Sequence, residues 1–478
     1  MGCCCGCSAQ VMDGSDMKIG TLWMPYSHAE LWKLITDLKT SPSKSITDFA
    51  ESVSCWCRRL RSVAGLRKAL HRYPDGQRDP ESYFIEHTLP VIVDHAIALK
   101  ERATAAFPEG IPLLRVGHRA SVRLPRGLVA SLVAHMFLCS WEAPVAVNYR
   151  IMPPNSFLKL LDGTSQAEVA KLRMFIHYFE RLGKDGELRG FIIIDRVYGV
   201  GLEQDGWQSS NKPLLPMNIA GQGKGFEEAP GLAHADFANM FLGGGVLSNG
   251  SIQEEIRFTI CPELLSAMLL CPRMDEDEAI QIVGAQQYSA YGGYGRNLAY
   301  AGDFKDTVYP RDADGTPLIS ILAMDAFDFK RRDSSLKAQM SPYFALRELN
   351  KALAAFTPVD EVSLRNFPSI ATGNWGCGAF KGNAPLKALL QWCAASQAGR
   401  QLRYFPFEMD WGPLLLEISN HLVAQGATVG ELMTAFWLVR ERLHTFKREN
   451  IFQAVDMTIA IGAAKDKGTD PSPAEATK

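Results

Sequence analysis

The stretch Gly190-Phe-Ile-Ile-Ile-Asp-Arg-Val197 divides the chain into two parts with different sequence patterns. A β-branched run bounded by glycine is typical of a buried strand. Before it, apolar residues recur every three or four positions, which predicts helices in the segments 27–38, 83–105, 127–141 and 168–182. After it, short apolar runs alternate with helical patterns. We therefore expect a helical domain, without strands, followed by an α/β layered domain.

The second part carries the more specific predictions of secondary structure. Strands are expected at 279–283, 318–323 and 401–407, and helices at 342–355, 386–399, 414–425 and 428–445. Ser341 and Pro342 are the expected N-cap and first residue of one helix, and Ser27 with Glu30 resembles a capping box. We place the boundaries at a Cys-rich tail (1–20), the helical domain (21–187), the α/β domain (188–462) and a polar tail (463–478). Both tails are expected to be disordered.

Composition excludes several classes of protein. The 478 residues are 47% hydrophobic and 21% charged, as in ordinary folded domains, and the net charge of −2 leaves no basic excess for direct nucleic-acid binding. Eleven cysteines and ten histidines show no zinc-ligand spacing, so neither a metal nor another cofactor is expected. Scattered cysteines fit a reducing compartment, cytoplasmic or nuclear.

The first residues suggest a lipid anchor. Gly2, followed by Cys3-Cys4-Cys5, resembles a myristoylation site beside palmitoylation candidates. Gly6 departs from that pattern, where serine or threonine is expected. Two acyl chains would tether the protein to a membrane; the alternative is an unmodified tail. The most apolar stretch, 128–141, is too short to span a bilayer.

The segment Asp236-Phe-Ala-Asn-Met-Phe-Leu-Gly-Gly-Gly-Val-Leu-Ser-Asn-Gly-Ser-Ile-Gln-Glu-Glu-Ile-Arg-Phe258 is the strongest chemical signal. Gly243, Gly244 and Gly245 allow a backbone cradle close to a ligand. Glu254 and Glu255 follow, and paired acids beside a cradle can hold a sugar and protonate an oxygen. Adjacent glutamates diverge in a helix or strand, so different roles are expected. If residues 236–239 form a helical turn, Asp236 and Asn239 share one face.

Two further segments look suited to ligand binding. Thr372-Gly-Asn-Trp-Gly-Cys-Gly-Ala-Phe380 contains Gly373, Gly376 and Gly378, whose amides can converge on a diphosphate. The alternative is a plain glycine-rich turn. Tyr288, Tyr291 and Tyr294 stand in a glycine-rich stretch, where exposed rings on a loop suit stacking on a base or sugar. The alternative for these tyrosines is ordinary surface packing.

These three segments together resemble the poly(ADP-ribose) glycohydrolase family. The resemblance covers roughly residues 124–441, includes Arg347-Glu-Leu-Asn-Lys-Ala352, and leaves residues 1–120 unplaced. It implies a macrodomain-like α/β/α layered mixed sheet preceded by a helical accessory domain. It also implies hydrolysis of the ribose–ribose bonds of poly(ADP-ribose) on modified proteins, with release of ADP-ribose and no metal.

The resemblance also implies roles for individual residues. Glu255 would be the general acid and later the base, with a pKa raised by its neighbours, and Glu254 would hold ribose hydroxyls. Asp236 would help order the catalytic loop. The implied substrate-binding residues are Asn239, Gly243, Gly244, Gly245, Gln253, Tyr291, Tyr294, Gly373, Asn374, Gly376, Cys377, Gly378, Ala379, Phe380 and Phe407, with Phe226 and Glu227 near adenine.

Departures from the family pattern are modest, since Ser248-Asn249 and Lys381 replace small residues and remove no catalytic group. Three other functions stay open at this level. The chain would be a non-catalytic reader of ADP-ribose, a hydrolase of mono-ADP-ribosyl or O-acetyl-ADP-ribose linkages, or a scaffold built on the helical domain. The presence of both glutamates and Gln253 argues against a non-catalytic reader.

Overall fold

The structure is a computed structural model that describes residues 20–71, 79–142, 151–186, 188–220, 229–305, 309–407, 409–442, 451–452, 455–456 and 458–459. Four sets of predictions fall outside these ranges: acylation at Gly2 and Cys3–Cys5, adenine contacts by Phe226 and Glu227, and the two tails at the chain ends.

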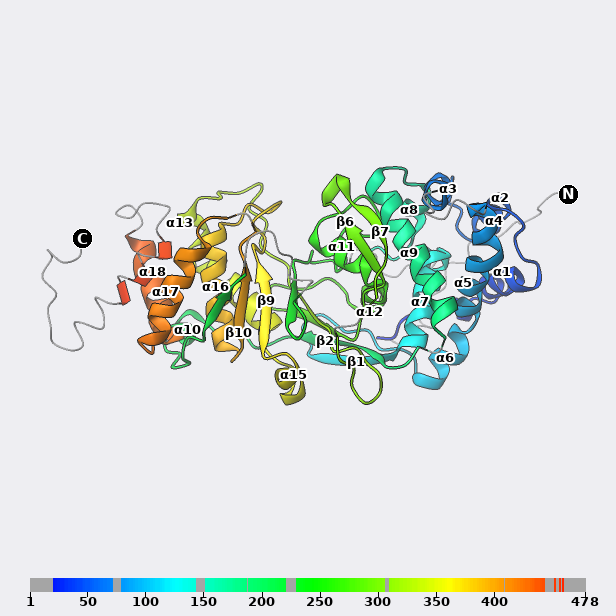
Figure 1. Cartoon of the computed structure of the whole chain (residues 1–478). Helices are drawn as coiled ribbons and strands as arrows, with labels where there is room; N and C mark the ends of the chain where they lie inside the picture. Colours follow the sequence, from blue (N-terminus) through cyan, green and yellow to red (C-terminus); the bar gives the residue numbers. More distant parts are fainter. Residues whose placement is uncertain are drawn as a thin grey trace, which may run out of the picture.

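An eight-stranded mixed sheet forms the centre of the described chain (Figure 1). Its spatial order is β1-β2-β5-β8-β4-β9-β10-β3. One half, from β8 to β3, is parallel, whereas β1, β2, β5 and β8 pair antiparallel. The strands are β1 (Ala120–Pro125), β2 (Phe191–Val197), β3 (Met217–Ile219), β4 (Ala233–Asp236), β5 (Ala279–Val283), β8 (Ser320–Ala323), β9 (Ser369–Gly373) and β10 (Gln401–Phe405).

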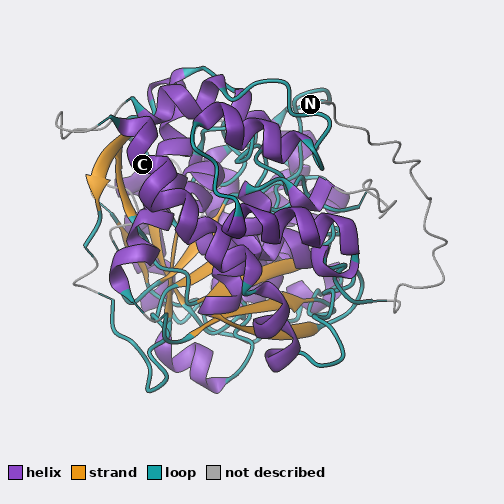
Figure 2. Ribbon diagram, turned by 90° about the vertical axis from the view of Figure 1, so that its right-hand side faces the viewer, coloured by secondary structure: helices purple, strands orange, loops and turns teal. Residues whose placement is uncertain are grey.

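Helices cover both faces of this sheet. Because side chains alternate along a strand, Ile280, Ile282 and Ile321 enter one core, while Leu322 and Ala235 enter another. The first core is shared with the helices of the N-terminal part, and the second with the helices that follow β8. Figure 1 shows these two groups of helices on opposite sides of the sheet, and in Figure 2 helices lie over its strands. The predicted fold class is therefore confirmed.

The N-terminal part is mostly helical, but two details differ from expectation. β1 lies inside the region that we expected to contain no strand, because its residues pair with β2. The N-cap of the first helix is His28, whose ring accepts a hydrogen bond from the Leu31 amide, and not Ser27. The helices are α1 (Ala29–Thr40), α2 (Ile46–Ser54), α3 (Ala64–Leu70), α4 (Pro80–Tyr83), α5 (Leu89–Ile97), α6 (Leu99–Ala106), α7 (Arg126–Phe137), α8 (Leu158–Asp162) and α9 (Gln166–Asp185).

The second part matches the predicted elements closely. β5 covers the predicted strand, and α14 has Ser341 at its N-cap and Pro342 as its first residue, as expected. The helices are α10 (Gln204–Gln208), α11 (Gln253–Ile260), α12 (Leu265–Leu270), α13 (Leu336–Gln339), α14 (Pro342–Phe356), α15 (Glu361–Asn366), α16 (Ala384–Gln397), α17 (Gly412–Ala424) and α18 (Val429–Glu441). A separate hairpin pairs β6 (Ser289–Gly292) with β7 (Ala299–Asp303). No helix in the described ranges has the length and apolar composition to cross a bilayer.

Candidate active site

The predicted site segments meet at one edge of the sheet. The carboxyl ends of parallel strands lie at the same edge, where open α/β sheets bind their ligands. Asp236 ends β4, Gly373 ends β9, and Phe407 follows the end of β10. Hydrogen bonds to backbone carbonyls join these loops: the Met324 amide donates to the Asp236 carbonyl (3.1 Å), and the Trp375 indole donates to the Met324 carbonyl (3.0 Å).

Glu254 and Glu255 lie in the first turn of α11. Negative charge is favoured there because the first amides of a helix are unpaired within it. Glu255 accepts a hydrogen bond from the Ile252 amide (2.9 Å), so it caps its own helix. Glu254 and Glu255 are nevertheless buried, with 3% and 7% of their surfaces exposed. Two buried carboxylates at a helix start require further donors.

The glycine loop supplies those donors. The Gly243 amide donates to Glu254 Oε1 (2.7 Å), and the Asn239 amide donates to Glu254 Oε2 (2.9 Å). The Gly245 amide donates to Glu255 Oε1 (2.9 Å). With the Ile252 amide, every oxygen of the two carboxyl groups accepts one backbone N–H. The sequence suggested that adjacent glutamates would diverge; in the structure a single loop folds around both.

Glycine is required in this loop for a steric reason. A Cβ at Gly244 (φ +50°) would lie 2.7 Å from both Glu254 Oε2 and Glu255 Oε1. A Cβ at Gly250 would lie 2.6 Å from Glu255 Oε1, and one at Gly243 (φ +84°) would lie 2.6 Å from Met268 Sδ. The loop therefore approaches the carboxylates more closely than a chain with side chains at these positions could.

The electrostatics of the site centre on Glu254. Burial raises the pKa of Glu254 well above its usual value, and the nearby Asp236 and Glu255 raise it further. The hydrogen bonds that the backbone amides of Asn239 and Gly243 donate to Glu254 oppose this rise in pKa. Asp236 is itself fully buried. The sequence did not single out Glu254 for a raised pKa, because that shift depends on the burial of its side chain in the folded chain.

The side chains of Asn239 and Gln253 hydrogen-bond to the backbone around the site. Asp236 ends a strand, and no helical turn joins it to Asn239, so the expected common helix face is wrong. Asn239 Oδ1 accepts from the Phe241 amide (3.0 Å). Gln253 accepts from the Phe237 amide (2.8 Å) and donates to the Ala235 carbonyl (3.3 Å), which ties α11 to the end of β4.

The second glycine-rich segment forms a loop directly after β9. Asn374 donates to the Pro406 carbonyl (3.0 Å) and accepts from the Tyr404 hydroxyl (3.0 Å), which joins this loop to the segment that carries Phe407. The Phe380 carbonyl accepts from the Phe329 amide (3.0 Å). Gly378 and Ala379 are exposed at the tip, whereas burial raises the pKa of the Cys377 thiol to about 12. The loop therefore presents its tip to solvent at the same sheet edge.

The three tyrosines separate in the structure. Tyr288 is buried, accepts from Arg126 (2.7 Å) and donates to Glu263 (3.2 Å), so the expectation of an exposed ring is wrong for it. Tyr291 is half-buried on β6. Tyr294 is 58% exposed, and the next amide, that of Gly295, donates to the Ser251 carbonyl (3.0 Å) of the catalytic loop. Phe407 is 62% exposed with φ +59°.

Comparison with known proteins identifies the family. A family model described as poly(ADP-ribose) glycohydrolase, helical domain, matches residues 77–196, and one described as poly(ADP-ribose) glycohydrolase, macro domain fold, matches residues 204–411. Poly(ADP-ribose) glycohydrolase 1 of Arabidopsis thaliana is 30% identical over a 413-residue alignment, and the match covers 70% of this chain and 72% of that protein. The chain belongs to the poly(ADP-ribose) glycohydrolase family.

Other proteins similar to this chain are also named poly(ADP-ribose) glycohydrolases. Probable poly(ADP-ribose) glycohydrolase 2 of Arabidopsis thaliana is 30% identical, covering 72% of this chain and 74% of that protein. Poly(ADP-ribose) glycohydrolase 1 of Caenorhabditis elegans is 32% identical, covering 70% of this chain and 42% of that protein. A crystal structure of a poly(ADP-ribose) glycohydrolase mutant from Deinococcus radiodurans with ADP-ribose matches at 13% identity and TM-score 0.26, covering 44% of this chain and 87% of that one.

Several buried charges near the glycohydrolase site escaped sequence reasoning. Lys171 of α9 lies against the catalytic loop, and an ion-pair network lies beneath the second loop. For the members that lie on helices, the sequence signal was a charged residue at a position where helical spacing predicts an apolar one. The members of the network are Asp325, Arg347, Glu348, Lys351 and Lys387. In the described part of the chain, no three His, Cys, Asp or Glu residues cluster as a metal site.

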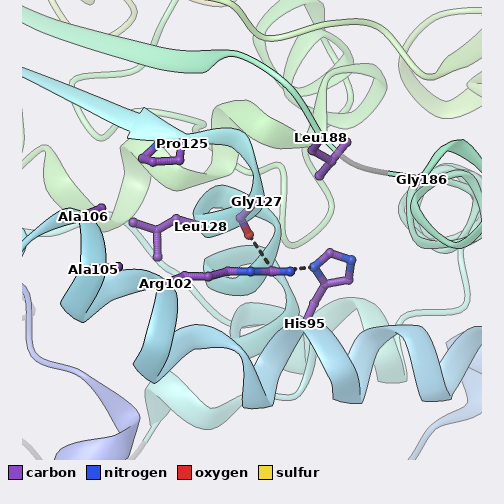
Figure 3. Close-up of a pocket in the computed structure, with 9 residues that line it drawn as sticks. All are labelled: His95, Arg102, Ala105, Ala106, Pro125, Gly127, Leu128, Gly186 and Leu188. Atoms are coloured by element: carbon purple, nitrogen blue, oxygen red, sulfur yellow. Dashed lines mark hydrogen bonds between the residues drawn. The ribbon is translucent and has the colours of Figure 1, made fainter.

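A cavity of about 500 Å³ lies in the helical part, away from this site (Figure 3). Arg102 donates to the Gly127 carbonyl (2.8 Å) and to Ser131 Oγ (2.9 Å), and lies 2.8 Å from His95 Nδ1. Because arginine only donates, that nitrogen accepts, and burial lowers the pKa of His95 to about 4. The cavity contains none of the residues assigned to the glycohydrolase site, so we do not regard it as the substrate site.

Proposed function

We propose that this chain hydrolyses the ribose–ribose O-glycosidic bonds of poly(ADP-ribose), releases ADP-ribose and so reverses poly-ADP-ribosylation of proteins. The observation that carries this proposal is the pair Glu254 and Glu255, buried at the ligand-binding edge of the sheet with all four oxygens fixed by backbone amides. Family membership supports the same chemistry. Glycoside hydrolysis needs carboxyl groups held in a fixed geometry beside the scissile bond.

We assign Glu255 as the general acid that protonates the leaving ribose oxygen and then as the base that activates water. Of the two glutamates, it is the more exposed, at 7% against 3%, which favours contact with substrate. Burial, with the nearby Asp236 and Glu255, raises the pKa of Glu254, which favours the neutral form of this carboxyl group. Glu254 would then donate to a ribose oxygen, and its neutral form would reduce charge repulsion beside Glu255.

We assign binding of the ADP-ribose unit to the loops that share this edge. Gly373, Asn374 and the tip at Gly378–Phe380 would hold the diphosphate, because a glycine-rich turn brings amides close to an anion. Tyr294 and Phe407, both more than half exposed, are available to cover the ligand. The amides of Gly243 and Gly245 already donate to the glutamates, so the catalytic loop would contribute mainly to chemistry. Contacts of Phe226 and Glu227 with adenine remain a prediction.

The test is incubation of purified protein with labelled poly(ADP-ribose) in the presence of EDTA. Wild type, Glu255→Gln and a control variant with an exposed glutamate, Glu51→Gln, are compared. We expect free ADP-ribose from wild type and Glu51→Gln, and almost none from Glu255→Gln. Binding of ADP-ribose, measured by calorimetry, should persist in all three.

Each alternative function gives a different result in this assay. Intact polymer that co-elutes with wild type would indicate a reader, and the catalytic assignment would be wrong. Release of ADP-ribose only from mono-ADP-ribosylated protein or from O-acetyl-ADP-ribose would show that the protein hydrolyses those linkages and not the polymer. Equal turnover by wild type and Glu255→Gln would remove Glu255 from the acid role.

Location in the cell is a separate proposal. Gly2 with Cys3–Cys5 would carry acyl chains and hold a fraction of the protein at a membrane, the remainder being cytoplasmic or nuclear. Wild type and Gly2→Ala would then divide differently between membrane and soluble fractions. Identical fractionation of the two would contradict acylation at this site.

A further inference from the structure

Lys171 lies in the second turn of α9, in the mostly helical N-terminal part of the chain, and its side chain is fully buried. Its Nζ donates to the carbonyl oxygens of Ser248 (2.6 Å), Val246 (2.8 Å) and Gly245 (3.3 Å), and also to that of Gly250. All four acceptors belong to one turn of the catalytic loop. The Lys171 side chain therefore hydrogen-bonds to the carbonyls of the same segment whose amides donate to the two glutamates.

This arrangement is unusual for a buried cation. Burial of an ammonium group is costly unless the charge is paired and hydrogen-bonded. In the described ranges, no carboxylate lies within ion-pair distance of Lys171, and peptide carbonyls alone replace its hydration shell. Such a site is retained more readily for precise placement of a backbone than for stability, because an apolar side chain would avoid the cost of desolvation.

The loop lies between this cation and the carboxylates. Gly245 accepts from Lys171 through its carbonyl and donates to Glu255 Oε1 through its amide. The Gly250 carbonyl also accepts from Lys171, and the Cα of the same residue packs so near Glu255 that a Cβ would lie 2.6 Å from Oε1. If the loop shifted away from Lys171, the Gly245 amide that donates to Glu255 and the Gly250 backbone that packs against Glu255 would both move.

We propose that Lys171 is a positioning residue for hydrolysis: it holds the loop 243–250 in the conformation that places Glu254 and Glu255. This inference rests on the proposed glycohydrolase function and extends it, because it gives the helical part a direct effect on turnover. Lys171 does not touch the reacting atoms in this role; it acts through the loop backbone.

The same helix also supports the other border of the site. His177 lies 3.1 Å from Asp303 at the end of β7, and Arg181 pairs with the same carboxylate. Arg173 lies over the Tyr300 ring, 5.1 Å from its centroid. Figure 1 shows α9 beside α11 and beside the β6–β7 hairpin, whose connecting loop carries Tyr294. One rigid helix thus contacts both the catalytic loop and the tyrosine hairpin.

The experiment compares Lys171→Met with Lys184→Met, a matched change at an exposed lysine of the same helix. Methionine keeps the length of the side chain and removes the charge and all donors. We expect kcat on poly(ADP-ribose) to fall roughly 100-fold in Lys171→Met, the scale for a displacement of about 1 Å at a catalytic group. The Kd for ADP-ribose should change less than about tenfold, because the second loop is intact. Lys184→Met should match wild type.

Hydrogen exchange of the peptide 241–252 provides a readout that does not depend on activity. Faster exchange in this peptide, with unchanged exchange in β4 and α11, would show that Lys171 orders the loop specifically. A folded Lys171→Met protein with kcat within threefold of wild type, or with unchanged loop exchange, overturns the proposal. Should this variant not fold, Lys171→Gln is measured in its place with the same thresholds.

Failure of this inference and failure of the proposed function give different results. An active wild type with an equally active Lys171→Met variant leaves the glycohydrolase function standing and removes the role of Lys171. An inactive wild type contradicts the function, and loop exchange alone then decides whether Lys171 positions the loop.

Discussion

The two glycine-rich loops of the site lie at the same sheet edge but are stabilised in opposite ways. The loop 243–250 uses its amides to hold Glu254 and Glu255 and its carbonyls to accept from Lys171. The loop 373–382 rests on Trp375, whose ring lies 3.8 Å from Lys387 Nζ. The first loop is ordered by the glutamates to which we assign the chemistry, whereas the second is ordered by buried ion pairs beneath it. Substitutions in the first should therefore change kcat, and those in the second should change stability and binding.

The largest effect is expected at Glu255, within the first loop. Glu255→Gln keeps the size of the side chain but removes the proton that the acid donates. We expect kcat to fall by roughly 10³-fold or more, within the range of general acid catalysis, with the Kd for ADP-ribose nearly unchanged. Single-turnover kinetics and calorimetry measure the two quantities. A larger loss in Glu254→Gln than in Glu255→Gln would reverse the roles that we assign to the pair.

The second loop should respond in stability. Glu348 pairs with Arg347 (2.7 Å) and with Lys387, and burial lowers the pKa of Lys387 well below its usual value. Glu348→Gln leaves a buried cation without its partner, so the free energy of unfolding should fall by about 3–5 kcal/mol. Urea denaturation measures this loss.

A double variant and a surface control sharpen the same measurement. Glu348→Gln with Lys387→Met removes the unpaired charge and should recover part of the lost stability. Glu51→Gln, at an exposed position, should stay within about 0.5 kcal/mol of wild type. A loss below about 1 kcal/mol in Glu348→Gln would mean that the network does not support the second loop.

A pair of glycine substitutions tests the contrast directly. Gly244→Ala would place a Cβ 2.7 Å from both glutamates, so kcat should fall roughly 100-fold. Gly376→Ala (φ +71°) would place a Cβ 2.4 Å from Ala326 Cβ, so it should cost about 1–3 kcal/mol of stability and raise KM. Gly206→Ala, inside α10, meets nothing closer than 3.4 Å and serves as the control. If Gly244→Ala and Gly376→Ala changed kcat and KM to a similar extent, the proposed difference between the two loops would be wrong.

The smallest effect is a dependence of kcat on pH. Burial lowers the pKa of Lys171 to about 8, against the opposing influence of Glu255 on α11 and Glu168 on its own helix, and the loop 243–250 has no titratable side chain. Loss of the Lys171 proton weakens its bonds to the loop carbonyls, so kcat should fall about tenfold between pH 8 and pH 9.5.

Unfolding does not explain such a fall. A lysine with a lowered folded-state pKa binds fewer protons when folded, so between pH about 8 and about 10.5 this group makes folding more favourable as pH rises. Circular dichroism should therefore show intact structure where kcat has already fallen. Lys171→Arg keeps its charge and should lack this high-pH loss. A wild-type kcat that is constant to pH 10 would contradict a role for the Lys171 charge.

Local patterns explain which elements were predictable. β2, β5 and α14 have apolar runs or caps that identify them without their neighbours. β4, with the sequence Ala-His-Ala-Asp, has no such pattern and becomes a strand because it pairs with β8 and β9. β1 was missed for the same reason, since its partner β2 lies about 70 residues further along the chain. Pairing over such separations leaves little trace in a short segment.

The sequence predicted the residues of the site better than it predicted their contacts in three dimensions. The sequence alone determined the paired glutamates, the need for glycine beside them and the family resemblance, because these depend on residue types at close spacing. Only the tertiary structure showed that Lys171 reaches the catalytic loop from α9 and that Tyr288 is buried against Arg126 and Glu263. It also showed that burial raises the pKa of Glu254. Burial and electrostatic contact depend on which distant segments pack together, and that packing exists only in the folded chain.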